Sequence, residues 1–273
     1  MTYATIMVYV ELGRGGAKHA KLAADLASRY EAALIGMAAA VPTDMPVFQA
    51  RPSEILTLTQ DTARLVSRLG DTKVQFLAGT REIPRVSWRE GFDFPTEALL
   101  REARAADLIV IGREHDPTVA VPSLDTARFI LQAGRPVLLV PPGIEYLQAS
   151  RVLVGWKDTR ESRHAVREAV PLLQKSKEVI LVEACAKGEE NTTLERLRDV
   201  EGYLGRHGVG PCTKYYINDI GDTAAELIRV AQDEGAGLIV AGAYGHTRLG
   251  EWAFGGVTRE LLSNSPLCCL LSH

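Results

Sequence analysis

Short apolar runs alternate with longer segments of helical periodicity along the chain. Ile6–Val10 and Val152–Trp156 are unbroken apolar stretches, typical of strands buried on both faces of a parallel sheet. In the segment after the second run, apolar residues recur at helical spacing and form one stripe that can face a sheet. The same pattern predicts further strands at 33–37, 74–77, 107–112, 136–140, 179–182, 213–217, 237–242 and 266–271, and helices near 96–106, 122–133, 222–234 and 252–264.

The two halves of the chain repeat each other. Gly112 and Pro136 are 24 residues apart, as are Gly242 and Pro266, and each pair brackets a predicted helix. Strands alternating with helices favour βαβ units. The repeat therefore predicts two tandem doubly wound α/β domains, each an open five-stranded parallel sheet with helices on both faces. Prolines and a glycine in 141–150 mark the linker, so we expect domains at 1–145 and 146–273.

Composition excludes several classes of protein. The net charge is −3, and basic residues form no stripe of the kind that a nucleic-acid binder carries. No apolar run reaches the roughly 20 residues needed to span a membrane, and the N-terminus does not read as a secretory signal. The four cysteines show no metal or redox spacing, so we expect reduced packing residues in a cytoplasmic protein without membrane or nucleic-acid partners.

Candidate chemistry gathers after the predicted strand 237–242. Gly242 and Gly245 follow this strand, and Gly255, Gly256 and Thr258 fall near the start of the next helix. In open parallel sheets, ligands collect beyond the carboxyl ends of the strands. Glycines let the backbone approach an anion closely, and helix-start N–H groups favour negative charge. This loop is a candidate phosphate site, although simple turns would need the same glycines.

Both halves resemble universal stress protein domains. The family's nucleotide motif is G-x2-G-x9-G followed by Ser or Thr, and this chain has Gly242, Gly245 and Gly255 at that spacing. The resemblance implies phosphates and ribose against the glycines and Val257-Thr258, and adenine near the ends of the first two strands. The implied binding residues, with two loop neighbours that either touch phosphate or are solvated, are Gly155, Trp156, Lys157, Asp158, Ala184, Gly242, Gly245, His246, Arg248, Gly255, Gly256, Val257 and Thr258.

The chain departs from the family pattern at two of these positions. Gly256 stands where the hydroxyl residue belongs, and Lys157 stands where the family usually has an acidic residue. Asp158 is next to Lys157 and can take the acidic role if the loop shifts by one residue. The first half keeps Gly112 but lacks the later glycines, so we expect it to be a packing partner rather than a nucleotide domain.

Rival motifs are weaker. Gly13–Lys18 follows the first strand, but a lysine occupies the position of the third glycine of a dinucleotide fingerprint. Glu161 and His164 suggest acid–base chemistry, but we expect them on one exposed helix face. Trp88 and 92–95 cluster before a helix and predict core or interface packing, with a small apolar pocket as the alternative.

These features predict a stress-response protein that binds ATP or another adenine nucleotide, with or without Mg²⁺, as a sensor or regulator rather than a dedicated enzyme. Two alternatives remain: an interaction module whose sites have decayed, and a slow ATP hydrolase. The resemblance also implies association through the fifth strands, 136–140 and 266–271, either between the two halves or between two chains of a homodimer.

Overall fold

The computed structural model describes residues 2–12, 16–41, 52–113, 123–218, 222–245 and 256–273. The chain divides into two compact units. One contains Ala4–Phe129 and Pro142–Glu145, and the other contains the N-terminal three residues, Ile130–Pro141 and Tyr146–His273. We call them the N-terminal and C-terminal units. The boundary between domains that the sequence repeat predicts, between residues 145 and 146, stays a prediction.

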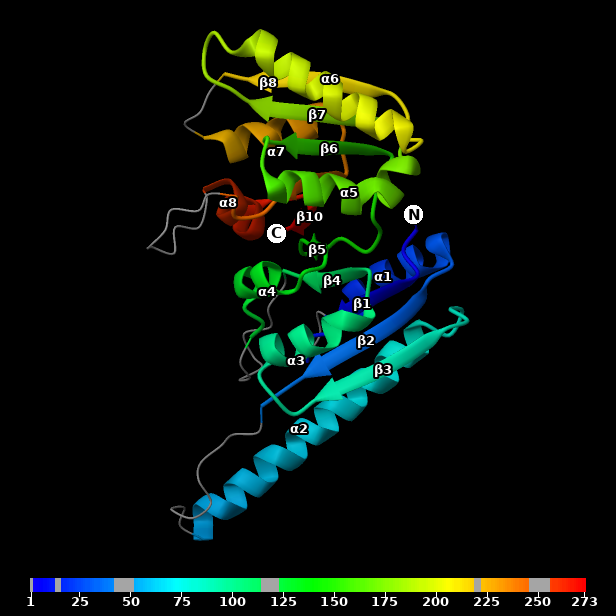
Figure 1. The fold of residues 1–273 in the computed structure, drawn as a ribbon. Coiled ribbons are helices and arrows are strands. Elements are labelled where there is room, and N and C mark those ends of the chain that lie inside the picture. The colour runs from blue at the N-terminus through cyan, green and yellow to red at the C-terminus, as the bar shows by residue number, and fades with distance from the viewer. Residues whose placement is uncertain (1, 13–15, 42–51, 114–122, 219–221, 246–255) are drawn as a thin grey trace. The chain divides into compact units, whose positions relative to one another are not determined.

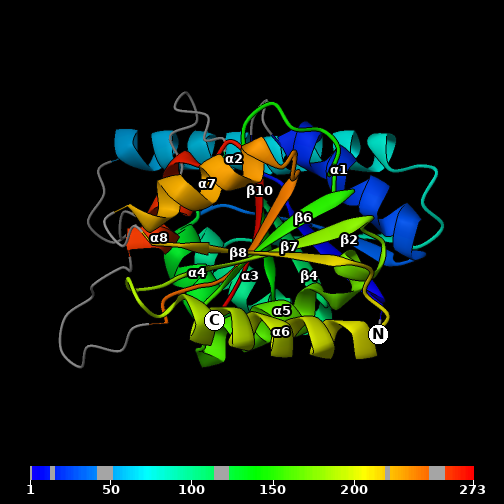
Figure 2. The same cartoon turned by 90° about the horizontal axis from the view of Figure 1, so that it is seen from above.

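The N-terminal unit is a parallel sheet with helices on both faces. Its strands lie in the order β3-β2-β1-β4. Figure 2 shows α1 and α2 on one face and α3 on the other. Its elements are β1 (Thr5–Tyr9), α1 (Gly16–Tyr30), β2 (Ala33–Ala39), α2 (Pro52–Gly79), β3 (Val86–Gly91), α3 (Pro95–Glu102) and β4 (Leu108–Gly112), followed at the boundary by α4 (Thr126–Gln132).

The C-terminal unit repeats this arrangement and adds one strand from the first half. Its order is β5-β10-β9-β6-β7-β8, parallel throughout except that β5 runs antiparallel to β10. Figure 1 follows its elements in colour: β5 (Val137–Val140), β6 (Arg151–Trp156), α5 (Arg160–Gln174), β7 (Glu178–Ala184), α6 (Glu190–Arg206), β8 (Cys212–Ile217), α7 (Thr223–Asp233), β9 (Leu238–Gly242), α8 (Gly256–Asn264) and β10 (Cys268–Ser272).

The unbroken apolar runs are buried strands, as the sequence predicts. Ile6, Val8, Leu153 and Leu238 are all completely buried. In the C-terminal unit α5 and α6 cover one face of the sheet, and α7 covers the other with α8 packed against it (Figure 2). Because both faces are covered, the central strands contribute apolar side chains in both directions to the core. The prediction of two mainly parallel α/β halves is confirmed.

The predicted strand at 74–77 is wrong. These residues lie inside α2, and the third strand is β3, about ten residues further along the chain. Leu65, Leu69 and Phe76 are buried, whereas Val74 is 67% exposed. This spacing matches one face of a helix, and a strand would have turned Val74 and Phe76 to the same side. The local apolar run was therefore read with the wrong period.

The remaining packing predictions have mixed outcomes. All four cysteines are free, and Cys185, Cys268 and Cys269 are buried. Burial raises the pKa of the Cys268 thiol to about 12, so it stays protonated and unreactive. Trp88 packs against the Phe76 ring with centroids 5.3 Å apart, as core packing predicts, but Phe92 and Phe94 are more than half exposed.

Candidate functional site

Three segments of the C-terminal unit meet at the carboxyl end of β9. They are the residues directly after β9, the start of α5 and the start of α8. A Cβ placed on Gly242 would lie 2.6 Å from the backbone nitrogen of Ser162, in the first turn of α5. A Cβ placed on Gly245 would lie 3.2 Å from Oγ1 of Thr159. Both glycines therefore permit the chain after β9 to pass directly against the beginning of α5.

The loop after β9 is also fastened to α8 and to the C-terminus. Tyr244 has φ of 61°, and its backbone N–H donates to Oγ1 of Thr258 at 3.3 Å. Thr258 is buried in the first turn of α8. On the other side, the backbone N–H of Ala243 donates to the carbonyl oxygen of Ser272 at 2.8 Å. These bonds fix Gly242–Gly245 at the edge of the sheet, as the sequence predicts for this loop.

Thr159 begins α5 and was not among the predicted site residues. Its side-chain oxygen accepts from the backbone N–H of Ser162 and caps the helix. A Thr directly before a helical apolar stripe is a recognisable cap signal, so the sequence could have pointed to it. The cap sets the position of the next residues, which contact the glycine loop.

The expectation that Glu161 lies on an exposed face with His164 is wrong for Glu161. Glu161 is only 9% exposed, and its Oε2 would lie 3.1 Å from a Cβ placed on Gly245. Burial by itself would raise the pKa of this carboxyl. Hydrogen bonds from its own backbone and from Thr159 outweigh that effect and, with the charges of Arg160 and His273, hold the pKa below its usual value. A carboxylate therefore lies beside the predicted phosphate loop.

The residues predicted around the adenine are divided between the two faces of the sheet. A Cβ on Gly155 would point toward Leu227 of α7, at 3.4 Å from its Cδ1. Trp156, the next residue, lies on the opposite face, where it lines a groove between α5 and α6 together with Asp158. Asp158 forms an exposed ion pair with Arg163 at 2.7 Å. Ala184 ends β7 and is partly buried.

The other predicted residues lie after β6, at α8 or outside the described part of the chain. Gly256 opens α8, is exposed, and has nothing within 4 Å of a Cβ placed on it; Val257 follows, partly buried, in the same turn. Lys157 follows β6 and its carbonyl accepts from the Thr159 N–H at 2.6 Å. His246, Arg248 and Gly255 lie outside the described residues.

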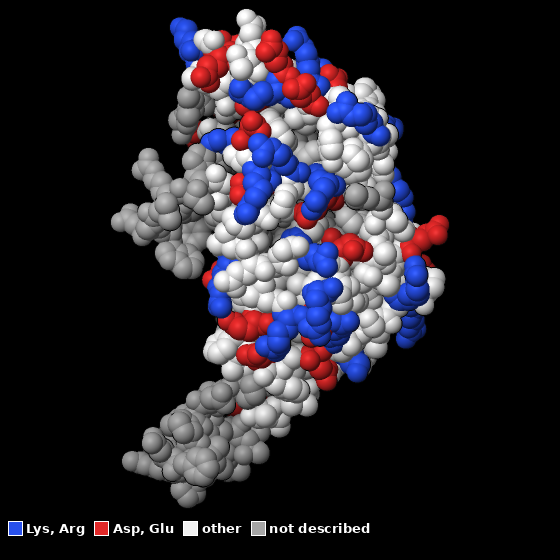
Figure 3. Space-filling view, viewed as in Figure 1, with Lys and Arg blue, Asp and Glu red and all other residues white. Residues whose placement is uncertain are grey.

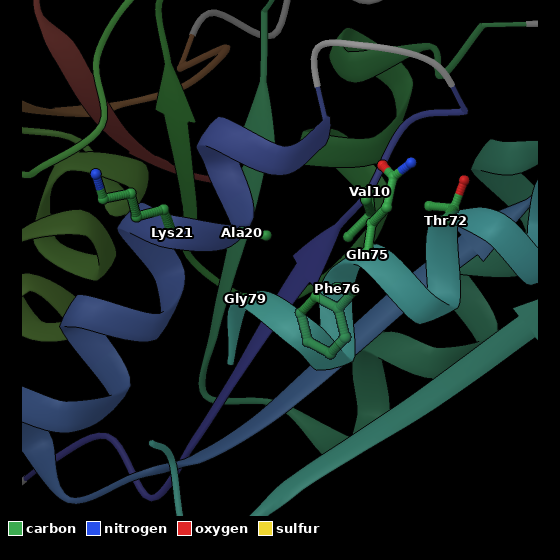
Figure 4. Close-up of a pocket in the computed structure, with 7 residues that line it drawn as sticks. All are labelled: Val10, Ala20, Lys21, Thr72, Gln75, Phe76 and Gly79. Atoms are coloured by element: carbon green, nitrogen blue, oxygen red, sulfur yellow. The ribbon is translucent and has the colours of Figure 1, made fainter. Parts of the chain in front are cut away.

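The N-terminal unit holds a small cavity between α1 and α2, shown in Figure 4, with a volume of about 250 Å³. Phe76, Thr72 and Gln75 approach it from α2, and Val10 directly follows β1. Lys21 of α1 is paired with Glu145 at 2.8 Å. Near the end of β4, a Cβ on Gly112 would overlap the ring of His19, which is almost fully buried. The histidine ring thus covers the face of Gly112 in this half.

Fold and site together define a tandem α/β protein whose candidate site lies at the carboxyl edge of a parallel sheet. Residues 149–273 match the sequence model of the universal stress protein family. The second half of the chain is therefore similar to that family. No curated protein matches the chain in sequence.

Solved structures extend the likeness in fold to the first half. The structure of a universal stress protein from Archaeoglobus fulgidus DSM 4304 superimposes with a TM-score of 0.66 at 13% sequence identity. The match covers 98% of this chain and 95% of the Archaeoglobus chain. The structure of a candidate universal stress protein from Pseudomonas aeruginosa UCBPP-PA14 superimposes with a TM-score of 0.62 at 17% sequence identity. The match covers 99% of this chain and 93% of the Pseudomonas chain. At such identities the likeness concerns the fold.

No helix in the described ranges has both the length and the apolar character needed to cross a bilayer. On the face seen in Figure 3, basic and acidic side chains are interspersed.

Proposed function

We propose that the C-terminal unit binds an adenine nucleotide and that the protein acts in the cytoplasm as a sensor or regulator of the stress response. The observation that carries this proposal is the convergence of the loop after β9 with the starts of α5 and α8. The Tyr244 N–H to Thr258 bond holds the loop against α8. Ligands of open parallel sheets bind at such an edge.

The start of α8 favours the phosphates. Its first turn contains no acidic residue, and its first position, Gly256, is open to solvent. Backbone N–H groups at a helix start are donors without helical partners, and the helix dipole adds partial positive charge. In this assignment Gly245, Gly255, Gly256 and Val257 lie along the phosphates, while Gly155, Asp158 and Ala184 lie toward the ribose and base.

The carboxylate of Glu161 favours a nucleotide that brings a cation. A bare phosphate at Gly245 would approach within a few ångströms of this negative charge, and the low local dielectric strengthens that repulsion. A Mg²⁺-bound phosphate carries less negative charge and offers a cation to the carboxylate. We therefore expect Mg-ATP to bind more tightly than ATP in the presence of a chelator. Lys157, after β6, would supply a further positive charge.

A gain-of-function variant tests the site. Gly256→Ser restores the hydroxyl of the family pattern at a position with no neighbour within 4 Å of the new Cβ. One added hydrogen bond to a charged phosphate should tighten Mg-ATP binding by about five- to tenfold in calorimetry. Gly205→Ser makes the same chemical change at another open glycine, in α6, and should leave the affinity unchanged. An affinity that Gly256→Ser does not raise would contradict the assignment of the phosphates to α8.

An interaction module with a decayed site is the alternative from another class. Lys157 and Gly256 favour it as departures from the family pattern, and the buried carboxylate of Glu161 adds to them. Protein that neither retains a nucleotide after purification nor melts at a higher temperature with Mg-ATP would support this alternative. A slow hydrolase would instead release ADP over hours in the same sample.

A further inference from the structure

The C-terminal unit contains a second concavity that the glycine loop does not form. It lies between α5 and α6, over the ends of β6 and β7, and has a volume of about 450 Å³. Trp156, Val166, Val200 and Tyr203 give it apolar and aromatic walls. Pockets for small ligands have this size and are lined mainly by such side chains, with a few polar groups that fix orientation. We call it the α5–α6 groove.

The two aromatic side chains of the groove are fixed in orientation by the strand and the helix that carry them. Trp156 is the last residue of β6 and is partly buried. Tyr203 projects from α6, and its ring packs against the ring of His207 with centroids 4.5 Å apart. A planar ring entering the groove would find aromatic faces from the sheet and from the helix, which favours stacking over a branched aliphatic ligand.

Two arginines on α5 supply positive charge at the groove. Arg163 and Arg167 are one helical turn apart, both line the groove, and their side chains are 58% and 54% exposed. Arg163 pairs with the exposed Asp158, and Arg167 lies 3.8 Å from Glu168. The Arg163–Asp158 pair is exposed on both sides, and such pairs are weak and exchange readily. Guanidinium groups bind planar carboxylates with two parallel hydrogen bonds, so this pair suits a carboxylate.

Two buried polar atoms without a partner among the described residues belong to Trp156 and Glu183. Trp156 lines the groove, and Glu183 lies behind the lining residue Arg196, which donates to it. Trp156 and Glu183 are paired in register on β6 and β7, so their side chains lie on the same face. Among the described residues, neither Nε1 of Trp156 nor Oε2 of Glu183 has a hydrogen-bond partner, although both atoms are buried. The other oxygen of Glu183 is occupied by Arg196, whose Nε donates to it at 2.9 Å.

These two atoms indicate which hydrogen-bonding groups a ligand would need. An indole N–H requires an acceptor, and a carboxylate oxygen requires a donor, and leaving either buried without a partner costs free energy. A heterocycle with an acceptor beside an N–H donor on one edge supplies both. The exposed arginines lie on α5 rather than on the strands, and an anionic substituent on the ring would pair with them.

We propose that the α5–α6 groove is a second ligand site, for a small planar heterocycle that carries a carboxylate. The heterocycle lies between Trp156 and Tyr203, its polar edge faces Trp156 and Glu183, and its carboxylate pairs with Arg163 and Arg167. This site uses the α5–α6 face of the sheet rather than the glycine loop. It shares only Asp158, the partner of Arg163, with the proposed nucleotide site.

Calorimetric titration with three organic probes and with inorganic phosphate tests the site on the full-length protein. Orotate has the heterocyclic edge and the carboxylate, uracil has only the edge, and benzoate has only the ring and the carboxylate. We expect orotate to bind at least tenfold more tightly than either of the others. If benzoate or inorganic phosphate bound as tightly as orotate, the groove would only attract anions and the proposal would be overturned. A lack of orotate binding would also overturn it.

Variants locate the binding within the groove. Arg167→Gln should weaken orotate binding about tenfold and leave uracil binding unchanged, because only the carboxylate loses a partner. Arg206→Gln removes a charge from the end of α6, outside the groove, and should change neither. Both substitutions are on helix surfaces, so melting temperatures should stay within a degree or two. Orotate binding that Mg-ATP displaces, or that Arg167→Gln leaves intact, would contradict a separate site.

Discussion

A glycine at the end of the fourth strand has a packing role in both halves. Gly112 lies against the ring of His19, and Gly242 lies against the backbone of Ser162, so in each half the first helix approaches the end of this strand too closely for a side chain. Gly242 therefore has a structural reason to be glycine that does not involve a ligand. The residues that bear more directly on phosphate binding are Gly245 and Gly256.

At the scale of the residue, helical spacing alone did not predict the burial of Glu161. Its distance from His164 in the sequence gives the two side chains neighbouring positions on α5. The spacing could not reveal that the loop after β9 covers the first turn of this helix and buries Glu161. That contact joins segments about eighty residues apart in the sequence, and no local pattern encodes it.

The lowered pKa of Glu161 leads to a prediction about pH. Because the folded pKa lies below that of the unfolded chain, the carboxylate contributes stability above roughly pH 5, and this contribution is lost as the pH falls through the folded value. Glu161→Gln should therefore lower the free energy of unfolding by about 1 kcal/mol at pH 7. The difference from wild type should shrink between pH 5 and pH 3.

Urea unfolding across this pH range measures the effect. Glu195→Gln changes an exposed carboxylate on α6 and serves as the control, with unfolding curves close to wild type at each pH. A difference that grows as the pH falls would mean that the carboxyl of Glu161 is protonated in the folded protein.

At the scale of the element, α2 was the segment that the sequence misrepresented. Val74–Leu77 is a short, mostly apolar segment, and such segments fit a buried strand or a helix equally well. Over the longer window the buried positions Leu65, Leu69 and Phe76 recur at helical spacing. The actual third strand, Val86–Gly91, is only partly buried and lacks a strong apolar run, which explains why it was missed.

Two alanine substitutions in α2 should differ sharply. Phe76→Ala removes a ring that is 2% exposed and packs at a tilt against Trp88, and should cost about 3–5 kcal/mol of unfolding free energy. Val74→Ala changes a side chain that is 67% exposed, and should stay within about 0.5 kcal/mol. Chemical denaturation measures both. Similar losses in the two variants would place both side chains on one face and argue for a strand.

At the scale of the molecule, the fifth strands carry the connection between the sequence halves. The resemblance implied that 136–140 and 266–271 associate, and β5 does pair antiparallel with β10, with Leu138 opposite Leu270. Since β9 occupies the other edge of β10, this strand is paired on both sides within one chain. A homodimer remains a prediction, and this pairing leaves β10 no free edge for it.

Removing β5 should convert the C-terminal unit into a self-associating fragment. A fragment of residues 146–273 lacks β5 and leaves the apolar edge of β10 unpaired, which is a template for pairing with a second copy. A fragment of residues 126–273 keeps α4 and β5. Light scattering after size exclusion should find a larger share of dimers or larger species for the shorter fragment than for the longer fragment. Two monomeric fragments would show that β5 is dispensable for covering this edge.

The sequence by itself determined the duplication, the parallel α/β character of both halves and the place of the glycine loop. These follow from local periods, because buried strands and amphipathic helices each have a repeat that can be read from neighbouring residues. The tertiary structure decided the rest: the burial of Glu161 beside Gly245, the opposite faces taken by Gly155 and Trp156, and the transfer of β5 to the C-terminal unit. Each of these depends on contacts between distant segments, whose geometry is fixed only when the whole unit packs.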